Sequence, residues 1–521
     1  MKVLKIVYIA VSMIWLAVLV VWSGMTLLRC FESPKKRPWS IDAKLPDRIH
    51  ADMLDGCWYK DELVNINGGW TRFLGKRLCN GVYRLSGAGR LFGDKPARLS
   101  DAEVEKRCRA IVGFRDFVNQ WGGRLLYLQP PYGIDNGNIM LPRGVLTDRV
   151  HGNENADRIV DMCCKTGTFV LDLRTFMTAT PKDVESSFYM TDHHWRIEAV
   201  FAYFPKLLAK MREIGVMNED YVWDESKWRY VFRPRFFLGY WGRRTGSLFS
   251  SLDDFGYYET ETGPMSMSVP SSLLFTKGPF NDVIISRKHL LGDTAKANRN
   301  AVYTGENAPL AIVRNPSAPM EKKILIMKDS FARPVIAFLS TLFREIHAID
   351  PRHYRSDVSE YAASVRPDCV LICYNPVSVS SRKGSWFDFG RMDSVPDLSR
   401  AKKIAEGLEE RVSSSMNEWA WKRLPVSLDS KCWYRISFKI DAATDVIGAT
   451  VRLYDLKQEK YVETATFPND GADTNQEWVF HTGENPVQIV LYAGVAGRTA
   501  GKCVRYSDIC VEKFVDIRQP L

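Results

Sequence analysis

The stretch Lys323-Ile324-Leu325-Ile326-Met327-Lys328-Asp329-Ser330-Phe331 decides the fold of this chain. Its apolar run, Lys323–Met327, predicts a buried strand, and the residues that follow, Phe331–Phe343, predict a helix. A serine at such a junction lies at the carboxyl end of a sheet, where the N–H groups of a helix N-terminus can face an oxyanion. Asp329 or Ser330 is also an ordinary helix N-cap, and on this segment alone capping is the commoner role.

Strands and helices alternate along residues 100–375. Apolar faces at helical spacing predict three further helices, Ala102–Trp121, Ala156–Lys165 and Arg196–Ile214. Short apolar runs predict three further strands, Arg124–Gln129, Thr168–Leu173 and Cys369–Tyr374. This alternation predicts an α/β fold with a parallel sheet and flanking helices, whose functional side chains gather at the carboxyl ends of the strands. The stretch Trp223–Val302, rich in arginine, aromatic and turn residues, predicts a long insertion or cap.

Length, charge and cysteine content narrow the class of protein. The 521 residues are too many for one compact core and indicate two or three domains. The net charge of +10, from 71 basic and 61 acidic residues, comes without a dense basic stripe, so nucleic acid is not an expected partner. The 11 cysteines form no C-x-x-C pattern, and we expect neither a metal site nor a cofactor.

Residues 1–30 predict an uncleaved transmembrane signal anchor. Ile6–Leu28 holds 23 consecutive residues without a charge, enough at about 1.5 Å per residue to cross a hydrocarbon core of about 30 Å. The basic residues on its two sides, Lys2 and Lys5 against Arg29 and Lys35–Arg37, oppose export of the following body when they are simply counted. Long domains translocate largely regardless of charge, so we interpret residues 31–60 as a stalk and leave orientation to the chemistry.

The sequence pattern changes after about residue 380. Residues 381–414 predict a linker that contains a charged helix, Leu398–Val412. Residues 415–521 hold short alternating runs separated by turns, which predict an antiparallel β-sandwich. The six runs are Trp433–Ile440, Ile447–Asp455, Tyr461–Phe467, Gln476–Thr482, Gln488–Gly494 and Cys503–Phe514.

Three local motifs predict structure away from the sheet. Asn67-Gly68-Gly69 and Asn80-Gly81 are typical of β-hairpin turns. Cys503 and Cys510 are close enough in sequence to bridge within a terminal hairpin, which an oxidising exterior would permit.

A second group of residues with catalytic potential is Thr191-Asp192-His193-His194-Trp195, at the entrance to a predicted helix. In Asp192-x-His194 the carboxylate can orient the imidazole and stabilise its cation, as the acid of a catalytic triad does. The alternative is that Thr191 or Asp192 caps the helix and that the histidines are loop residues or metal ligands.

A third group ends the predicted strand Cys369–Tyr374. Tyr374 or the following Asn375 could bind a substrate or donate a hydrogen bond to an oxyanion. Asn-Pro is also a common turn, so a structural role is at least as probable for these two residues.

A strand-end serine, an Asp-x-His and a strand-end asparagine are together the parts of a serine acyl hydrolase or acyltransferase. The segments Tyr189–Trp195, Lys328–Phe331, Gly239–Gly246 and Leu252-Asp253-Asp254 resemble the DHHW protein family. That family is related to the SGNH-hydrolase-like alginate O-acetyltransferases of the AlgJ and AlgX type. The resemblance covers roughly residues 60 to 380, so we assign 61–380 to an SGNH-hydrolase-like O-acetyltransferase domain.

The resemblance implies that Asp192, His194 and Ser330 form a triad in the chain order Asp, His, Ser, and it carries no role onto His193. It implies that an MBOAT-type membrane protein supplies an acetyl group, which the serine passes to a hydroxyl of an exported polysaccharide. The body would then face the periplasm or the extracellular side of the cell membrane, attached by its single N-terminal helix.

Further residues are expected to support this reaction. The backbone N–H groups of Ser330 and Phe331 would form the oxyanion hole, with Asn375 as a weaker donor. Four side chains could line a groove for an acidic glycan, although exposed arginines are mostly just solvated: Arg243, Arg244, Arg333 and Tyr374. The C-terminal sandwich resembles carbohydrate-binding modules. Its candidate sugar-stacking aromatics, which are more often core residues at such positions, are Trp433, Trp478, Tyr454, Tyr434 and Tyr492.

Two alternatives remain open at the level of the sequence. The same triad serves a polysaccharide acetyl-esterase, because water and a sugar hydroxyl compete for one acyl-enzyme. A catalytically silent glycan-binding scaffold subunit of an export complex would use Asp192 and Ser330 only as helix caps.

Overall fold

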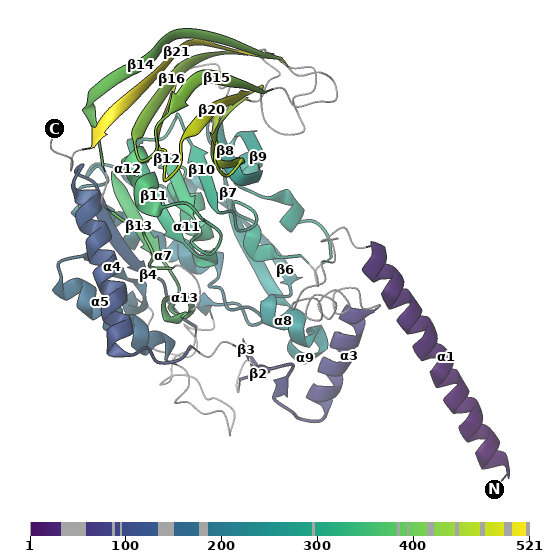
Figure 1. Cartoon of the computed structure of the whole chain (residues 1–521). Helices are drawn as coiled ribbons and strands as arrows, with labels where there is room; N and C mark the ends of the chain where they lie inside the picture. The colour runs from purple at the N-terminus through teal and green to yellow at the C-terminus, as the bar shows by residue number, and fades with distance from the viewer. Residues whose placement is uncertain are drawn as a thin grey trace.

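The computed structural model describes residues 2–32, 59–85, 89–93, 96–133, 151–176, 186–272, 274–293, 297–382, 386–392, 395–413, 421–442, 448–468, 475–493 and 503–516. Figure 1 shows a central sheet with helices on both faces, and curved antiparallel strands that cover one end of this α/β body. The predicted anchor is helical, in α1 (Lys2–Glu32). Within the described ranges, no helix is both long and apolar enough to cross a bilayer. The anchor therefore stays a prediction of the sequence.

The α/β body is built on an eight-stranded sheet with the order β5-β4-β13-β11-β12-β10-β8-β9. Five neighbouring strands are parallel: β5 (Phe169–Asp172), β4 (Arg124–Gln129), β13 (Cys369–Cys373), β11 (Met320–Lys328) and β12 (Phe343–Ile349). Three antiparallel strands complete the other edge: β10 (Leu310–Arg314), β8 (Met265–Val269) and β9 (Leu274–Gly278). The parallel part confirms the predicted α/β sheet, and the antiparallel edge is additional to it.

Strand β11 lies inside the sheet and is buried on both faces. Ile324 and Ile326 face a core formed with α7 (Ile197–Glu213) and α11 (Arg333–Leu339). Leu325 and Met327 face the opposite core, which is formed with three helices: α4 (Asp101–Asn119), α5 (Gly152–Lys165) and α12 (Val358–Val365). Full burial stabilises each of these side chains by roughly 2 kcal/mol, which explains the unbroken apolar run.

The segment after β11 is shorter than the sequence predicts. A short 3-10 turn, η7 (Ser330–Ala332), leads directly into α11, and β12 already begins at Phe343. The predicted helix Phe331–Phe343 therefore exists only in its middle part. After a turn, its last residue, Phe343, already belongs to the neighbouring parallel strand, because a buried strand and a buried helix have similar composition.

The stretch Trp223–Val302 is not a separate cap. It contains a two-stranded ribbon, β6 (Trp228–Phe237) with β7 (Asp253–Thr260), and two short helices, α8 (Tyr240–Thr245) and α9 (Ser247–Ser250). Its later part supplies β8 and β9 of the central sheet, together with α10 (Phe280–Val283). The prediction of an insertion is therefore wrong for β8 and β9, which belong to the central sheet.

The N-terminal part of the body contains one correctly and one wrongly predicted turn. Asn80 and Gly81 have positive φ angles of 48° and 76° and join β1 (Leu78–Cys79) to β2 (Val82–Arg84), as predicted. A third short strand is β3 (Leu91–Phe92). Asn67-Gly68-Gly69 instead lies within α3 (Lys60–Phe73). A Cβ atom on Gly68 would lie 1.8 Å from the carbonyl oxygen of Thr245, so this glycine serves close packing of α3 on α8 rather than a turn.

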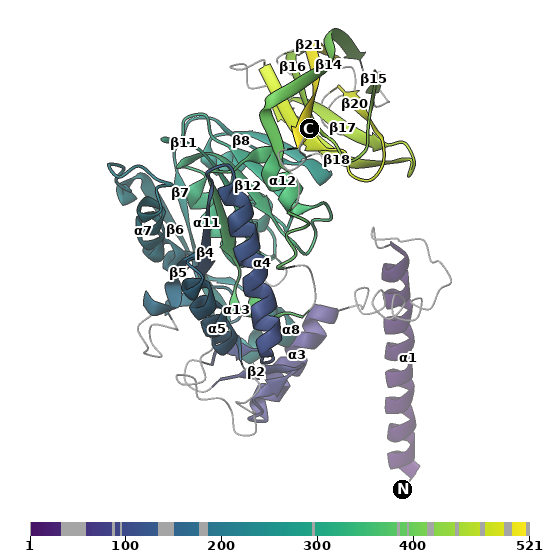
Figure 2. The same cartoon turned by 60° about the vertical axis from the view of Figure 1, so that its left-hand side comes forward.

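Two four-stranded antiparallel sheets form the C-terminal body, and Figure 2 shows them packed against each other. One has the order β14-β21-β16-β19: β14 (Pro396–Ser413), β21 (Cys503–Asp516), β16 (Trp433–Ala442) and β19 (Asn475–His481). The other has the order β15-β20-β17-β18: β15 (Trp421–Leu428), β20 (Val487–Tyr492), β17 (Gly448–Asp455) and β18 (Lys460–Pro468). Apolar residues of both sheets share one core. The predicted antiparallel architecture is confirmed.

Two local predictions about this body are wrong. The charged segment Leu398–Val412 is not a helix, because it forms most of β14 and pairs along β21. The strand pattern therefore begins at Pro396, inside the predicted linker. Cys503 and Cys510 lie on the same strand, seven residues and roughly 23 Å apart, and both are free thiols, so they cannot bridge each other.

The two bodies meet where α12 faces strands β18 and β19. His481 of β19 and Glu360 of α12 form an ion pair of 3.0 Å. Glu463 of β18 lies close to the same pair. Burial, followed by the Glu360 carboxylate, raises the pKa of Glu463 to about 7, and His481 only partly offsets this.

We predict that this carboxyl group weakens the protein at alkaline pH. A pKa raised from 4.5 to about 7 by folding means that stability is lost as the pH rises through that interval. Glu463→Gln should therefore be more stable than the wild type by about 1 to 3 kcal/mol near pH 8, and the difference should largely vanish near pH 5. Thermal unfolding at both pH values measures this. Glu477→Gln, at an exposed carboxylate of β19, should show no such pH-dependent gain.

Candidate active site

Ser330 lies where β11 ends, and the side chain of Asp329 fixes the backbone around it. Asp329 Oδ1 accepts a hydrogen bond of 2.8 Å from the N–H of Phe331. Its Oδ2 accepts bonds of 2.8 and 2.6 Å from the backbone N–H and the side-chain amide of Asn375, just beyond β13. Burial raises the pKa of Asp329, and these hydrogen bonds oppose that rise. One carboxylate thus joins the ends of two adjacent parallel strands to the turn that carries Ser330.

A continuous hydrogen-bond chain links Ser330, His194 and Asp192. The distance from Ser330 Oγ to His194 Nε2 is 2.7 Å, and that from His194 Nδ1 to Asp192 Oδ1 is 2.6 Å. With Nδ1–H donating to the carboxylate, Nε2 is left to accept the serine proton. The structure therefore brings together the three residues that the sequence pattern singles out, although 136 positions separate His194 from Ser330.

Asp192 is held as a carboxylate. It is only 1% exposed, and besides the imidazole it accepts the N–H of His194 at 2.9 Å and the N–H of Tyr240 at 2.6 Å. Burial alone would raise the pKa of Asp192, but the charges of His194 and His193 and these hydrogen bonds outweigh it and hold that pKa well below its usual range. The negative charge can therefore stabilise an imidazolium at His194.

Asp253 organises the loop that carries Asp192. Its carboxylate accepts hydrogen bonds from the N–H of Met190 at 2.6 Å and from the N–H and hydroxyl of Thr191 at 2.8 and 2.5 Å. Thr191 in turn accepts the N–H of Gly239 at 2.7 Å. A Cβ atom on Gly239 would lie 2.3 Å from Cβ of Asp192, so only glycine fits there. We assign no role to Asp253 from sequence, and its place in a segment resembling the DHHW family is the one signal that points to it.

With the adjacent His193, the same loop has enough donor groups for a metal site. Asp192, His193 and His194 offer ligand atoms within 4.8 Å of one another. The 2.6 Å contact between Nδ1 of His194 and Oδ1 of Asp192 is, however, a hydrogen-bond distance, shorter than two ligands around one ion can adopt. The ring of His193 packs instead beside that of His194, with centroids 4.1 Å apart. The arrangement of donor atoms favours proton transfer over metal binding.

Two of the three expected oxyanion-hole donors, the N–H of Phe331 and the side chain of Asn375, are used by other partners in the structure. The N–H of Phe331 is donated to Asp329 and is not available to an oxyanion. The side-chain amide of Asn375 donates to Asp329 and, at 3.2 Å, to Ser378, while its oxygen caps α13 (Pro376–Ser380). No described residue accepts a hydrogen bond from the N–H of Ser330, which leaves that group as the oxyanion donor among the three.

Three of the predicted groove residues lie elsewhere or are engaged. Tyr374 is fully buried beside Trp386, on the opposite face of the sheet. Arg333 is 2% exposed and donates to Asn307 Oδ1 at 2.7 Å, and burial lowers its pKa to about 10. Arg244 is exposed on α8, and its guanidinium donates to the carbonyl oxygen of Asn80 at 2.9 Å.

The fourth predicted groove residue, Arg243, is half-buried on α8 close to the Asp192 loop. The N-cap and first turn of that helix contact the loop directly, through the Gly239, Tyr240 and Gly242 backbone N–H groups. A groove contact of Arg243 stays a prediction.

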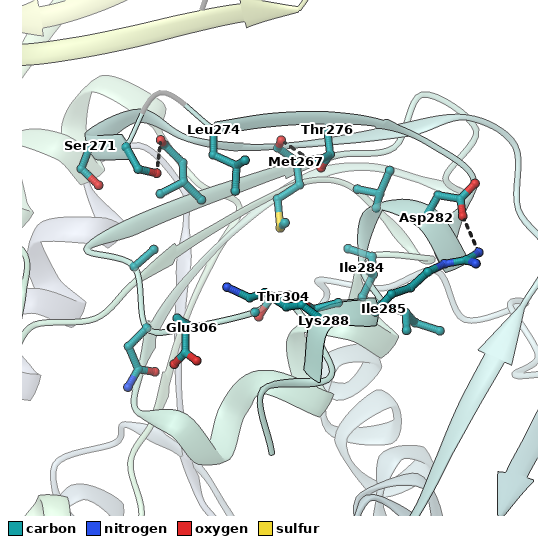
Figure 3. A pocket seen from close by; sticks show the side chains of 18 of the residues that line it. Met267, Ser271, Leu274, Thr276, Asp282, Ile284, Ile285, Lys288, Thr304 and Glu306 are labelled. Carbon is teal, nitrogen blue, oxygen red and sulfur yellow. Dashed lines mark hydrogen bonds and ion pairs between the residues drawn. The ribbon is translucent and has the colours of Figure 1, made fainter. Parts of the chain in front are cut away.

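Among the described residues, a large cavity lies away from Ser330, His194 and Asp192. It has a volume of about 680 Å³, and Figure 3 shows Met267 and Thr276 on one wall and Ile284, Lys288 and Glu306 on the other. It opens between the antiparallel edge strands and the segment after α10, and no triad residue lines it. Asn307 lines this cavity and accepts a hydrogen bond from the guanidinium of Arg333. That arginine side chain is therefore directed to the cavity wall and not to Ser330.

The candidate sugar-stacking aromatics differ in exposure. Trp433 is 1% exposed and packs into the core of the α/β body, so its ring has no face available to a sugar. Tyr434 and Tyr492 are buried as well. Trp478 and Tyr454 are half-buried, and Arg423 lies over the Tyr454 ring at 4.8 Å. The prediction is wrong for the buried Trp433, Tyr434 and Tyr492 and stays open for Trp478 and Tyr454.

We predict that Ser330 is a reactive nucleophile. Phenylmethylsulfonyl fluoride should modify the chain at Ser330, because His194 is placed to remove the hydroxyl proton. Peptide mass spectrometry locates the adduct. His194→Ala should slow the reaction by at least about a hundredfold. Ser286→Ala, in the cavity at the other edge of the sheet, is the matched control and should react as the wild type. An adduct rate that ignores His194 would contradict the assignment.

A further prediction concerns Trp433. Because this side chain fills the contact between the two bodies, Trp433→Ala should lower the free energy of unfolding by about 3 to 5 kcal/mol in denaturant titrations. Trp421→Ala, at a side chain that is 50% exposed, should change it by less than about 1 kcal/mol. Loss of glycan binding without loss of stability in Trp433→Ala would instead support the sugar-stacking role.

No model of a protein family matches this chain, and no curated protein matches it. Several solved structures are similar to it. Bacillus cereus PatB1 is 18% identical, over 59% of this chain and 100% of its own, with a TM-score of 0.49. A DHHW family protein from Eubacterium siraeum is 16% identical, over 60% of this chain and 95% of its own, with a TM-score of 0.44.

The O-acetyltransferase domain of Pseudomonas putida AlgJ is 13% identical, over 58% of this chain and 93% of its own, with a TM-score of 0.35. The structural neighbours thus include a DHHW family protein and an AlgJ domain, the two kinds of protein that the sequence resembles. At these identities and TM-scores, the chemistry has to be argued from the site itself.

Proposed function

We propose that this chain is a serine-dependent O-acetyltransferase that transfers acetyl groups to hydroxyls of an exported polysaccharide. The observation that carries the proposal is the hydrogen-bond chain from Ser330 through His194 to the ionised Asp192. A serine that only caps a helix does not require an imidazole nitrogen 2.7 Å from its hydroxyl oxygen. Folding likewise does not require a buried carboxylate that orients this imidazole. The scaffold alternative does not account for this geometry.

In the first half-reaction, Ser330 Oγ attacks the carbonyl carbon of the acetyl donor while His194 Nε2 takes the serine proton. Asp192 holds Nδ1–H and stabilises the imidazolium that forms. The N–H of Ser330 faces the developing oxyanion. When the tetrahedral intermediate collapses, His194 returns the proton to the departing group and acetyl-serine remains.

In the second half-reaction, a sugar hydroxyl attacks the acetyl-serine carbonyl. His194 removes the proton of that hydroxyl, and the same proton returns to Ser330 Oγ as the C–O bond to the enzyme breaks. The acetyl group ends on the sugar, and the enzyme is restored. Water in the place of the sugar would give free acetate, which is the acetyl-esterase outcome.

The supply of the donor is part of the proposal. We infer that an MBOAT-type membrane protein presents the acetyl group, that the N-terminal helix keeps the chain at the cell membrane, and that the catalytic body faces the periplasm or the extracellular side. The apolar sequence Ile6–Leu28 supports attachment to a membrane. Trp478 and Tyr454, which keep partial exposure, are the proposed glycan contacts of the C-terminal sheets.

We predict that the purified full chain cleaves p-nitrophenyl acetate and, with alginate or neutral glucan oligosaccharides present, yields acetylated sugar detectable by mass spectrometry. Ser330→Ala and His194→Ala should each lower the rate at least about a thousandfold, because the residues of a triad act as a unit. Ser286→Ala, in the cavity at the other edge of the sheet, is the matched control and should retain turnover.

The outcomes separate the alternatives. Free acetate without acetylated sugar in every acceptor reaction would favour an acetyl-esterase. Equal turnover in the wild type and Ser330→Ala would exclude the triad assignment. Absence of any acyl-enzyme in the wild type, with glycan binding retained, would favour the scaffold.

A further inference from the structure

The outward face of helix α3 is apolar. Five side chains on this face are exposed by 46% to 78%, and we call them the α3 stripe: Leu63, Ile66, Trp70, Phe73 and Leu74. Leu63, Ile66, Trp70 and Phe73 follow one another at intervals of three or four residues, and Leu74, just past the end of the helix, comes four residues after Trp70, so all five share one side of it. Trp70 and Phe73 also stack on each other, with centroids 5.5 Å apart.

The inward face of α3 carries small and polar residues. Gly68 packs against the backbone of Thr245, and Asn65 Oδ1 accepts the N–H of Leu248 at 2.8 Å. An ordinary surface helix buries its apolar side and exposes its polar side. In α3 this polarity is reversed. A row of large apolar side chains that is kept in contact with water indicates a surface that is covered by something outside the chain.

Charge identifies the kind of surface that would cover it. The stretch Leu63–Gly93 contains five basic residues and no acidic residue. Three of them, Arg72, Lys76 and Arg77, are exposed at the end of α3. The acidic residues of the helix are confined to its first turn. Exposed arginine and lysine beside tryptophan and phenylalanine is the combination that suits the boundary between anionic lipid headgroups and acyl chains.

We propose that the α3 stripe docks on the surface of an anionic lipid bilayer, with α3 lying in the plane of the interface. In both views of the molecule α3 lies at the end of the α/β body away from the C-terminal sheets (Figures 1 and 2). The apolar row enters the boundary region of the bilayer, and the basic groups meet lipid phosphates.

Docking has a consequence for the site. Helix α3 packs on α8, and the first N–H of α8, that of Tyr240, binds the carboxylate of Asp192. A docked α3 therefore holds the loop of Asp192 and His194 at a fixed height above the lipid. This inference does not depend on acetyl transfer, since lipid contact and turnover are measured separately.

The test uses the full chain in vesicles of equal parts phosphatidylglycerol and phosphatidylcholine. Hydrogen–deuterium exchange of peptides from α3 should be about tenfold slower in the wild type than in the double variant Ile66→Ser/Phe73→Ser. These side chains are 64% and 78% exposed, so the substitutions remove no core contact. Raising NaCl to about 0.5 M should reduce the difference, because salt screens the basic groups.

A second measurement does not depend on helix stability. With brominated phosphatidylcholine in the vesicles, the quenching of tryptophan fluorescence should contain a component that Trp70→Phe removes. The matched control is Val222→Ser, which removes an equally exposed apolar side chain, 79% exposed, outside the stripe, and should leave α3 exchange as in the wild type.

Three results would overturn the proposal. They are equal exchange of α3 in the wild type and the double variant, absence of the Trp70 component in the quenching, and protection of α3 that rises with protein density at constant lipid. The last result would indicate a second copy of the chain as the occupant of the stripe.

Discussion

The site depends above all on the buried carboxylate of Asp329. It accepts hydrogen bonds from the turn after β11 and from the backbone and side chain of Asn375 beyond β13. A buried charge is tolerated only with such partners, so the ends of the two strands cannot move apart without leaving it unpaired. Ser330, the next residue, is therefore held in place by the same hydrogen bonds. His194 then needs only one further constraint, the Asp192 loop clamped by Asp253, to meet the serine.

Much of this arrangement can be predicted because its signals are local. The apolar runs of β4, β11 and β13 predict buried parallel strands, and Asp192-x-His194 brings its own acid within reach of its imidazole. The strand-to-helix junction predicts where Ser330 lies. What the sequence alone does not give is that these pieces meet, since the contact between His194 and Ser330 spans 136 residues. The family resemblance supplied that link, and the geometry agrees with it.

The failures arise where long-range contacts overrule local preference. Leu398–Val412 has the charge pattern of an exposed helix, but pairing with β21 makes it a strand. Gly68 has the signature of a turn, yet it serves close contact with Thr245. Phe331 and Asn375 are in suitable sequence positions for an oxyanion hole, but their N–H groups donate to Asp329 instead. Hydrogen-bond partners of this kind are invisible in a single sequence because they come from other strands.

The order of strands also bears on how the molecule assembles. β13 is the last strand of the sheet in sequence, yet it lies between β4 and β11, so it joins the early and late parts of the chain. Asp192 and His194 are synthesised long before Ser330, and the hydrogen bonds between Asp329 and Asn375 become possible only later still. Folding must therefore close a large loop around a central gap, a slow process of high contact order. Until β13 fills that gap, Asp329 lacks its bonds to Asn375, and the turn that carries Ser330 is not yet held in place.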